Sequence, residues 1–207
     1  MTTIQTVIFD IGNVLIQWHP EAFFDRAIGP ERRAAYFDAV PMNEMNDRVD
    51  AGENFHEALA EMAQLYPDWT AEIGIWRDRW IDMISPAIDH SVRLLRALRR
   101  AGHPVVALSN FGVETFAMAE RENPFLEEFD QRILSGELRT SKPFAPIYEA
   151  AEAAIGLPPE TLLFTDDRAD NIEAARARGW QTHLFDGPQG WADRLVAEGL
   201  LTPEAAT

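Results

Sequence analysis

Three short apolar segments of the sequence each end in polar side chains that could carry out chemistry. The segments are residues 7–9, 104–108 and 161–164, and the side chains that follow them are Asp10, Ser109 and Asn110, and Asp166 and Asp167. If these groups meet at one place, the three carboxylates cannot all stay ionised without a cation. Oxygen ligands, in a chain with no cysteine and no paired histidines, favour Mg²⁺ over zinc.

A phosphoryl group suits such a site. The Ser109 hydroxyl and backbone N–H groups would hold its oxygens, and one carboxylate would remain as a nucleophile. Lys142 would supply positive charge. It is the only lysine among 18 basic residues, which marks a position where a compact ammonium is used in place of a guanidinium.

The elements that must position these residues alternate along the chain. β-Branched and aromatic runs predict strands at residues 4–9, 104–108, 132–134, 161–164 and 180–184, and helical spacing predicts helices between them. This alternation is typical of an α/β protein with a doubly wound parallel sheet. Because the carboxyl ends of parallel strands line the crevice where ligands bind, we expect the polar side chains to converge there.

Residues 20–86 are predicted to form a helical insertion. Apolar residues recur there at helical spacing, as at Phe55, Leu59 and Met62, and the breaks between such runs indicate about four helices. The polar stretch 43–48 is interpreted as a loop between helices, which is either solvated or forms hydrogen bonds with a hydroxylated substrate. Trp76 and Trp80 are interpreted as core residues that at most form a wall of the pocket.

Composition and charge restrict the function further. The chain has 207 residues, of which 46% are hydrophobic and 25% charged, so it can form a buried core. Its net charge of −16 argues against nucleic acid or an anionic membrane as a partner. With no cysteine, signal peptide or long apolar run, we expect a soluble, cytoplasmic protein, either a monomer or a homodimer.

Four stretches resemble the ordered motifs of the haloacid dehalogenase-like hydrolase superfamily. They are Val7-Ile-Phe-Asp10-Ile-Gly-Asn-Val14, Leu108-Ser109-Asn110, Ser141-Lys142-Pro143, and Leu163-Phe-Thr-Asp166-Asp167-Arg-Ala-Asp-Asn171. The likeness extends over essentially the whole chain. It is greatest to the phosphatase subgroup whose first motif reads Asp-x-Gly-Asn, which includes bacterial glucose-1-phosphate phosphatase-like enzymes. It implies a Rossmann-like core of residues 1–16 and 87–207 with an inserted helical, C1-type cap of residues 17–86.

The resemblance also implies roles for individual residues. Asp10 would attack phosphorus, form an aspartyl phosphate and bind Mg²⁺. Asp167 and the Gly12 carbonyl would be further metal ligands, with Asp166 either a ligand or its support and Asn171 an outer partner. Ser109 and Asn110 would hold phosphate oxygens, and Lys142 would balance the phosphate charge and orient Asp10. The expected activity is Mg²⁺-dependent hydrolysis of a small phosphorylated metabolite, such as a sugar phosphate.

The sequence departs from the commonest family pattern at Gly12, where most phosphatases of the superfamily have a second Asp that acts as general acid and base. Loss of that proton transfer costs about 10² to 10⁴ in rate. We therefore hypothesise that substrates with a less basic leaving oxygen are favoured. His19, near the start of the insertion, is a candidate replacement for the acid, although a packing role beside Trp18 competes with it.

Three rival interpretations remain. A haloacid dehalogenase uses the same attack by Asp10 on carbon and needs no metal, but dehalogenases of the superfamily lack a metal-binding pair such as Asp166 and Asp167. A phospho-receiver module also combines an acidic pair, an acceptor Asp and Lys-Pro, but there the acidic pair comes first. A catalytically weak member that only binds a phosphorylated ligand would be consistent with Gly12.

Overall fold

A computed structural model describes residues 3–207 and shows a five-stranded parallel sheet. The strand order is β5-β4-β1-β6-β7. The strands are β1 (Thr6–Phe9), β4 (Val105–Ser109), β5 (Gln131–Leu134), β6 (Leu162–Asp166) and β7 (Gln181–Leu184). The central strand β1 pairs in parallel with β4 on one side and with β6 on the other. The predicted α/β class with a doubly wound, Rossmann-like parallel sheet is confirmed.

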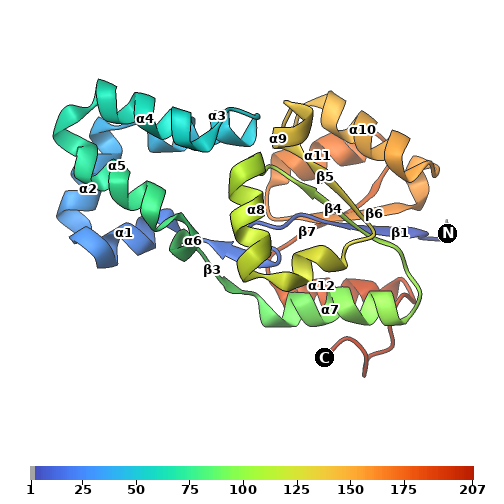
Figure 1. Ribbon diagram of the computed structural model, residues 1–207. Coiled ribbons are helices and arrows are strands. Elements are labelled where there is room, and N and C mark those ends of the chain that lie inside the picture. The colour runs from blue at the N-terminus through green and yellow to red at the C-terminus, as the bar shows by residue number, and fades with distance from the viewer. Residues whose placement is uncertain (1–2) are drawn as a thin grey trace.

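Helices cover both faces of this sheet, so its central strand is buried on both sides (Figure 1). Val7 and Phe9 belong to one apolar cluster, and the alternating residue Ile8 belongs to the other. The first cluster includes residues of α7 (Asp89–Arg100), α8 (Val113–Glu122) and α12 (Pro188–Ala197). The second includes residues of α10 (Ala145–Ile155) and α11 (Ala169–Ala177). Short helices complete this part of the chain: α9 (Ser135–Leu138), η2 (Pro124–Glu128) and η3 (Pro159–Thr161).

The chain leaves and returns to this region through two short strands that the sequence analysis did not predict. They are β2 (Ile16–Trp18) and β3 (Ile84–Ala87), which pair antiparallel. Six α-helices lie between them in the described chain, where about four were expected. They are α1 (Pro20–Ile28), α2 (Pro30–Ala39), α3 (Met42–Asp50), α4 (Phe55–Leu65), α5 (Thr70–Asp78) and α6 (Trp80–Met83), with the 3₁₀ helix η1 (Pro67–Trp69) before α5.

The polar stretch 43–48 is part of helix α3, so its interpretation as a loop is wrong. Met42, Met45 and Val49 are spaced so that all three lie on one helix face, and all three are buried. Three apolar residues are enough to fix the helix by tertiary packing, although the rest of its sequence is polar. The polar side chains of α3 therefore have defined directions.

Aromatic side chains hold the inserted helices together. The ring of Trp76 lies 5.8 Å from that of Phe24, which lies 5.3 Å from that of Tyr36, so α5, α1 and α2 share one cluster. Trp76 is fully buried, which confirms its interpretation as a core residue. No helix within residues 3–207 is long and apolar enough to span a membrane. The division into a core and a cap at residues 17 and 86 stays a prediction.

Candidate active site

The structure brings the predicted acidic residues together at the carboxyl ends of adjacent strands. Asp10 follows β1, Asp166 is the last residue of β6, and Asp167 comes directly after it. One carboxylate oxygen from each of the three lies within 4.8 Å of the others. Ser109, at the end of β4, reaches the same place. This convergence arises because β1 lies between β4 and β6 in the sheet.

The carboxylate of Asp10 is held through one oxygen only. Its Oδ1 accepts hydrogen bonds from the Ile11 N–H at 2.7 Å and from the Ser109 hydroxyl at 2.6 Å, and it lies 2.9 Å from the Lys142 ammonium. Asp10 is only 7% exposed, and this burial raises the pKa of its carboxyl while the charge of Lys142 lowers it. All three contacts leave Oδ2 for another partner.

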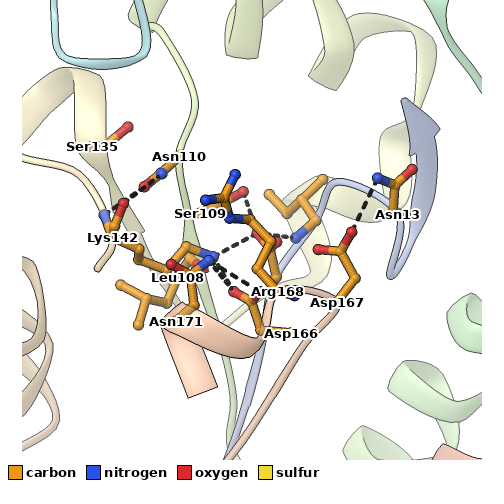
Figure 2. A network of polar contacts seen from close by, with 12 residues as sticks. Asn13, Leu108, Ser109, Asn110, Ser135, Lys142, Asp166, Asp167, Arg168 and Asn171 are labelled. Carbon is orange, nitrogen blue, oxygen red and sulfur yellow. Dashed lines mark hydrogen bonds and ion pairs between the residues drawn. The ribbon is translucent and has the colours of Figure 1, made fainter. Parts of the chain in front are cut away.

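Lys142 is buried and contacts two of the acidic residues, Asp10 and Asp166, of which Figure 2 labels Asp166. Its ammonium lies 2.6 Å from Oδ2 of Asp166 and donates to the carbonyl of Leu108 at 2.8 Å, in addition to its contact with Asp10. Burial alone would lower the pKa of Lys142, but the charges of Asp10 and Asp166 outweigh it and the net shift is upward. Its three donors are all engaged by Asp10, Asp166 and the Leu108 carbonyl, so the ammonium is fixed within the cluster.

Asp166 is the most tightly held of the three carboxylates. Its Oδ1 accepts from the Arg168 N–H at 2.8 Å, and the side-chain amide of Asn171 lies 3.0 Å from both of its oxygens (Figure 2). Asn171, on α11, is only 1% exposed. Asp166 therefore has little freedom to turn, and its oxygens accept four hydrogen bonds from three donor groups, counting Lys142.

Asn13 positions Asp167, a relationship that the sequence analysis missed. The Asn13 side chain donates to Oδ2 of Asp167 at 3.1 Å (Figure 2), and it accepts from the Trp18 N–H at 2.9 Å. Its backbone has φ 54°, a left-handed conformation in which Asn is enriched. The same turn carries Gly12, whose position is open: a Cβ there would meet nothing within 4 Å. The available signal was an Asn directly after the Gly of a turn.

Asn110 ties the end of β4 to the loop that carries Lys142. Its side chain accepts from the backbone N–H of Lys142 at 2.7 Å and donates to the carbonyl of the same residue at 3.0 Å. Both polar atoms of the Asn110 amide are thus engaged with Lys142, as Figure 2 shows. The pair fixes the two loops relative to each other, and Lys142 is placed by its backbone as well as by its charge.

A cavity of about 290 Å³ opens above these residues, and the inserted helices form part of its wall. Helix α3 contributes Asn46, Asp47 and Asp50, and the aromatic side chains of Trp18 and Trp80 also line it. The sequence analysis considered the first two only as part of a loop and did not identify Asp50. Their spacing, which places all three near one side of a helix, was the available signal.

His19 is not part of this cavity in the structure. It precedes α1 as an exposed residue, and its backbone N–H donates to the carbonyl of Met83 at 2.9 Å. It does not line the cavity that contains Asp10. The candidate replacement acid of the sequence analysis therefore lies outside the site, because the chain turns away from the cavity between Trp18 and Pro20.

The donor set fits a hard divalent cation. Three carboxylates lie close together, burial raises the pKa values of Asp10 and Asp167, and a cation would relieve the repulsion between them. The hydrogen bonds to Asp10 use Oδ1, and the side-chain hydrogen bond to Asp167 uses Oδ2, so one oxygen of each carboxylate has no hydrogen-bond partner among the described residues. Such oxygen ligands are those that Mg²⁺ prefers.

The chain is similar in sequence to known hydrolases. Residues 4–179 match the haloacid dehalogenase-like hydrolase family. A phosphatase of Mycobacterium tuberculosis (strain CDC 1551 / Oshkosh), MT3486, is 26% identical over 95% of this chain and 94% of its own length. Haloacetate dehalogenase H-2 of Moraxella sp. (strain B) is 33% identical, but the match spans only 42% of this chain and 39% of the dehalogenase, less than half of that relative.

Solved structures share the fold. An enzyme of the same family from Bacteroides thetaiotaomicron, BT-2542, superimposes with a TM-score of 0.76 over 94% of this chain and 99% of its own, at 20% identity. The same enzyme in complex with magnesium and inorganic phosphate gives a TM-score of 0.69, with coverage of 89% of this chain and 95% of its own. At this identity, the likeness concerns the fold.

Proposed function

Because the chain belongs to the haloacid dehalogenase-like hydrolase family, we propose that it is a Mg²⁺-dependent phosphatase acting on a small phosphorylated metabolite through an aspartyl phosphate on Asp10. The observation that carries the proposal is the geometry of Asp10. Its Oδ1 is occupied by three donors, and its Oδ2 remains for attack within a cluster of carboxylates suited to a metal ion.

The residues that would hold Mg²⁺ are Asp10, Asp167 and the carbonyl of Gly12, with Asp166 as a fourth ligand or as support for the others. The ion would neutralise charge on the phosphoryl oxygens and so favour attack by an anionic nucleophile. Asn13 supports this arrangement by fixing the orientation of Asp167.

The chain's own residues then carry out the displacement. Ser109 and Lys142 hold Oδ1 of Asp10, so Oδ2 attacks phosphorus while the bond from phosphorus to the leaving oxygen breaks and that oxygen keeps the electron pair. Hydrolysis of the aspartyl phosphate by water releases inorganic phosphate and restores the carboxylate. The backbone N–H of Asn110, directly after β4, would hold a phosphate oxygen, whereas the next two N–H groups, of Phe111 and Gly112, donate to Ser135 and Asp50.

The cavity supports a small, hydroxylated leaving group, which a sugar phosphate would provide. Its volume of about 290 Å³ is small, and it is lined by polar side chains of α3 and by aromatic side chains from β2 and α6. Asn46 and Asp47 offer hydrogen-bond partners for hydroxyl groups, whereas Trp18 and Trp80 offer apolar surface for a ring.

The proposal is tested by phosphate release from a panel of sugar phosphates with and without Mg²⁺. We expect turnover by the native chain to require the metal and to fall to background in Asp10→Asn. Asp193→Asn, an exposed substitution on α12, is the control and should leave turnover unchanged. Equal rates for the native chain and Asp10→Asn would overturn the assignment of the nucleophile.

A dehalogenase is the second candidate, favoured by the likeness to haloacetate dehalogenase H-2. That reaction would also begin with Asp10 but needs no metal. Halide release from haloacetate that persists in EDTA, together with no phosphate release from any compound in the panel, would favour it. The pair Asp166 and Asp167 beside Asp10 argues for the metal-dependent reaction.

A further inference from the structure

Position 12 lacks the acid that most relatives use, and the cavity contains another carboxyl that could replace it. We infer that Asp50, supplied by helix α3, donates a proton to the leaving oxygen and later accepts one from the attacking water. This inference rests on the proposed phosphatase function and assigns the proton-transfer role within it.

The first support is where Asp50 lies. It is the last residue of α3 and lines the same cavity as Asp10. In an in-line displacement the leaving oxygen lies on the side of phosphorus opposite the nucleophile. Because Asp10 comes from the end of β1 and α3 lines the same cavity, we expect the leaving oxygen to face the inserted helices. Asp50 is a carboxyl on the part of the cavity wall that these helices form.

The second support is how firmly Asp50 is held. Its Oδ1 accepts from the backbone N–H of Gly112 at 3.1 Å, and its Oδ2 accepts from the side-chain amide of Asn46 at 3.1 Å. The Ser135 hydroxyl donates to its backbone carbonyl. Figure 1 shows α3 reaching from the inserted helices toward α8 and α9, the elements that begin next to Gly112 and Ser135.

This end of α3 is packed against the segment after β4 without space to spare. A Cβ on Gly112 would lie 2.6 Å from Cγ1 of Val49 and 3.0 Å from its carbonyl oxygen, so only glycine permits the approach. Asp50 is therefore fixed with respect to Ser109, three residues before Gly112, and through it to Asp10. A catalytic group needs this kind of fixed placement.

The ionisation of Asp50 suits the role. Burial raises the pKa of its carboxyl to about 7, and the nearby charges of Asp47 and Asp10 act in the same direction, against the hydrogen bonds from Gly112 and Asn46. A general acid works best when its pKa lies near the working pH. The other charged groups that line the cavity are Lys142, Asp167 and Arg168.

The two half-reactions balance. In the first, Oδ2 of Asp10 bonds to phosphorus, the bond to the leaving oxygen breaks, and that oxygen takes its proton from the neutral Asp50 carboxyl. In the second, the Asp50 carboxylate takes a proton from water as the water oxygen bonds to phosphorus. The bond between phosphorus and Asp10 breaks, and its electron pair returns to the Asp10 carboxylate. Asp50 ends the cycle protonated, as it began.

The test compares Asp50→Asn with the native chain on two substrates. An alkyl phosphate such as glycerol phosphate has a basic leaving oxygen, whereas 4-nitrophenyl phosphate has one that leaves without a proton. We expect Asp50→Asn to lose about 10² to 10⁴ in kcat/KM on the alkyl phosphate and less than about 10-fold on the aryl phosphate. Asp50→Glu should recover part of the loss, and Glu44→Gln, an exposed change on the same helix, should have no effect.

Outcomes that overturn the inference differ from those that overturn the phosphatase function. Equal losses on both substrates would make Asp50 a structural residue only, and no loss on either would remove it from the reaction. Absence of activity toward both substrates in the native chain would instead contradict the phosphatase proposal. If Asp50→Asn does not fold, the pH dependence of kcat/KM of the native chain on the two substrates decides. A fall in kcat/KM above about pH 7 on the alkyl phosphate alone supports the inference, and identical pH profiles on the two substrates refute it.

Discussion

The ammonium nitrogen of Lys142 lies 2.9 Å from Oδ1 of Asp10, and the two side chains are 1% and 10% exposed. Two buried carboxylates, Asp10 and Asp166, share this single cation. An Arg in its place would need room for a planar group with five donors, whereas here three acceptors surround one compact nitrogen. The only lysine of the chain is thus used where its geometry matters.

Removing this cation should destabilise the protein more than an exposed ion pair would. Lys142→Met leaves two buried carboxylates without compensation, a change that typically costs about 3–5 kcal/mol. We expect a loss of this size in urea unfolding at pH 7, and a smaller loss at pH 5, because burial raises the pKa of Asp10 to about 6 and its carboxyl is then largely neutral. The double variant Asp10→Asn/Lys142→Met should recover part of the stability. If Lys142→Met is as stable as the native chain at pH 7, this account is contradicted.

The convergence of polar side chains at the strand ends could be predicted from sequence because it depends on local patterns. Asp10, Ser109 and Asp166 each end a buried apolar run, and in a parallel sheet such ends meet at one edge. The two short strands β2 and β3 were missed because three or four residues, partly exposed, carry no clear alternation. The contributions of the inserted helices were missed for another reason.

Contacts between residues far apart in the sequence depend on tertiary packing that no local pattern encodes. Asp50 contacts Gly112, 62 positions away, and Asn13 contacts Asp167, 154 positions away. The direction of Asp50 follows from the burial of Met45 and Val49, which fix the rotation of α3. The sequence shows that Met45 and Val49 lie on one face of a helix, but it does not show the surface against which that face packs.

Asn13 should control metal affinity separately from stability. Loss of its hydrogen bond frees Asp167 to rotate, and such supporting contacts are typically worth about 10- to 100-fold in metal affinity. We expect Asn13→Gly and Asn13→Ala to weaken Mg²⁺ binding equally in calorimetric titration. Because position 13 has φ 54°, which Gly adopts without strain, the free energy of unfolding of Asn13→Ala in urea should be about 1–2 kcal/mol lower than that of Asn13→Gly. Equal stability of the two variants would contradict the role of the left-handed backbone.

Magnesium itself should stabilise the folded chain. An ion that binds only the folded state, present at about 100 times its Kd, contributes about 2.7 kcal/mol, or about 5–10 °C in Tm for a chain of this size. We expect this rise in thermal unfolding of the native chain and of the control Asp193→Asn. Asp167→Asn should abolish most of it. A rise of the same size in Asp167→Asn would show that the ion binds elsewhere.

The pH dependence of stability should carry the signature of Asp50. Its pKa is about 7 in the folded chain and about 3.9 in an unfolded one. Between these values the folded state holds a proton that the unfolded state has lost, so the contribution of Asp50 is fully present below pH 4 and lost as pH rises to 7.

Asp50→Asn removes this dependence while keeping an oxygen for Gly112. The free energy of unfolding of Asp50→Asn minus that of the native chain should therefore rise by on the order of 2–4 kcal/mol from pH 4 to pH 7, then level off. Taking the difference cancels the titration of Asp10 and other groups shared by both proteins, and Glu44→Gln serves as the flat reference. A difference that does not change with pH would mean that Asp50 titrates as an ordinary surface carboxyl.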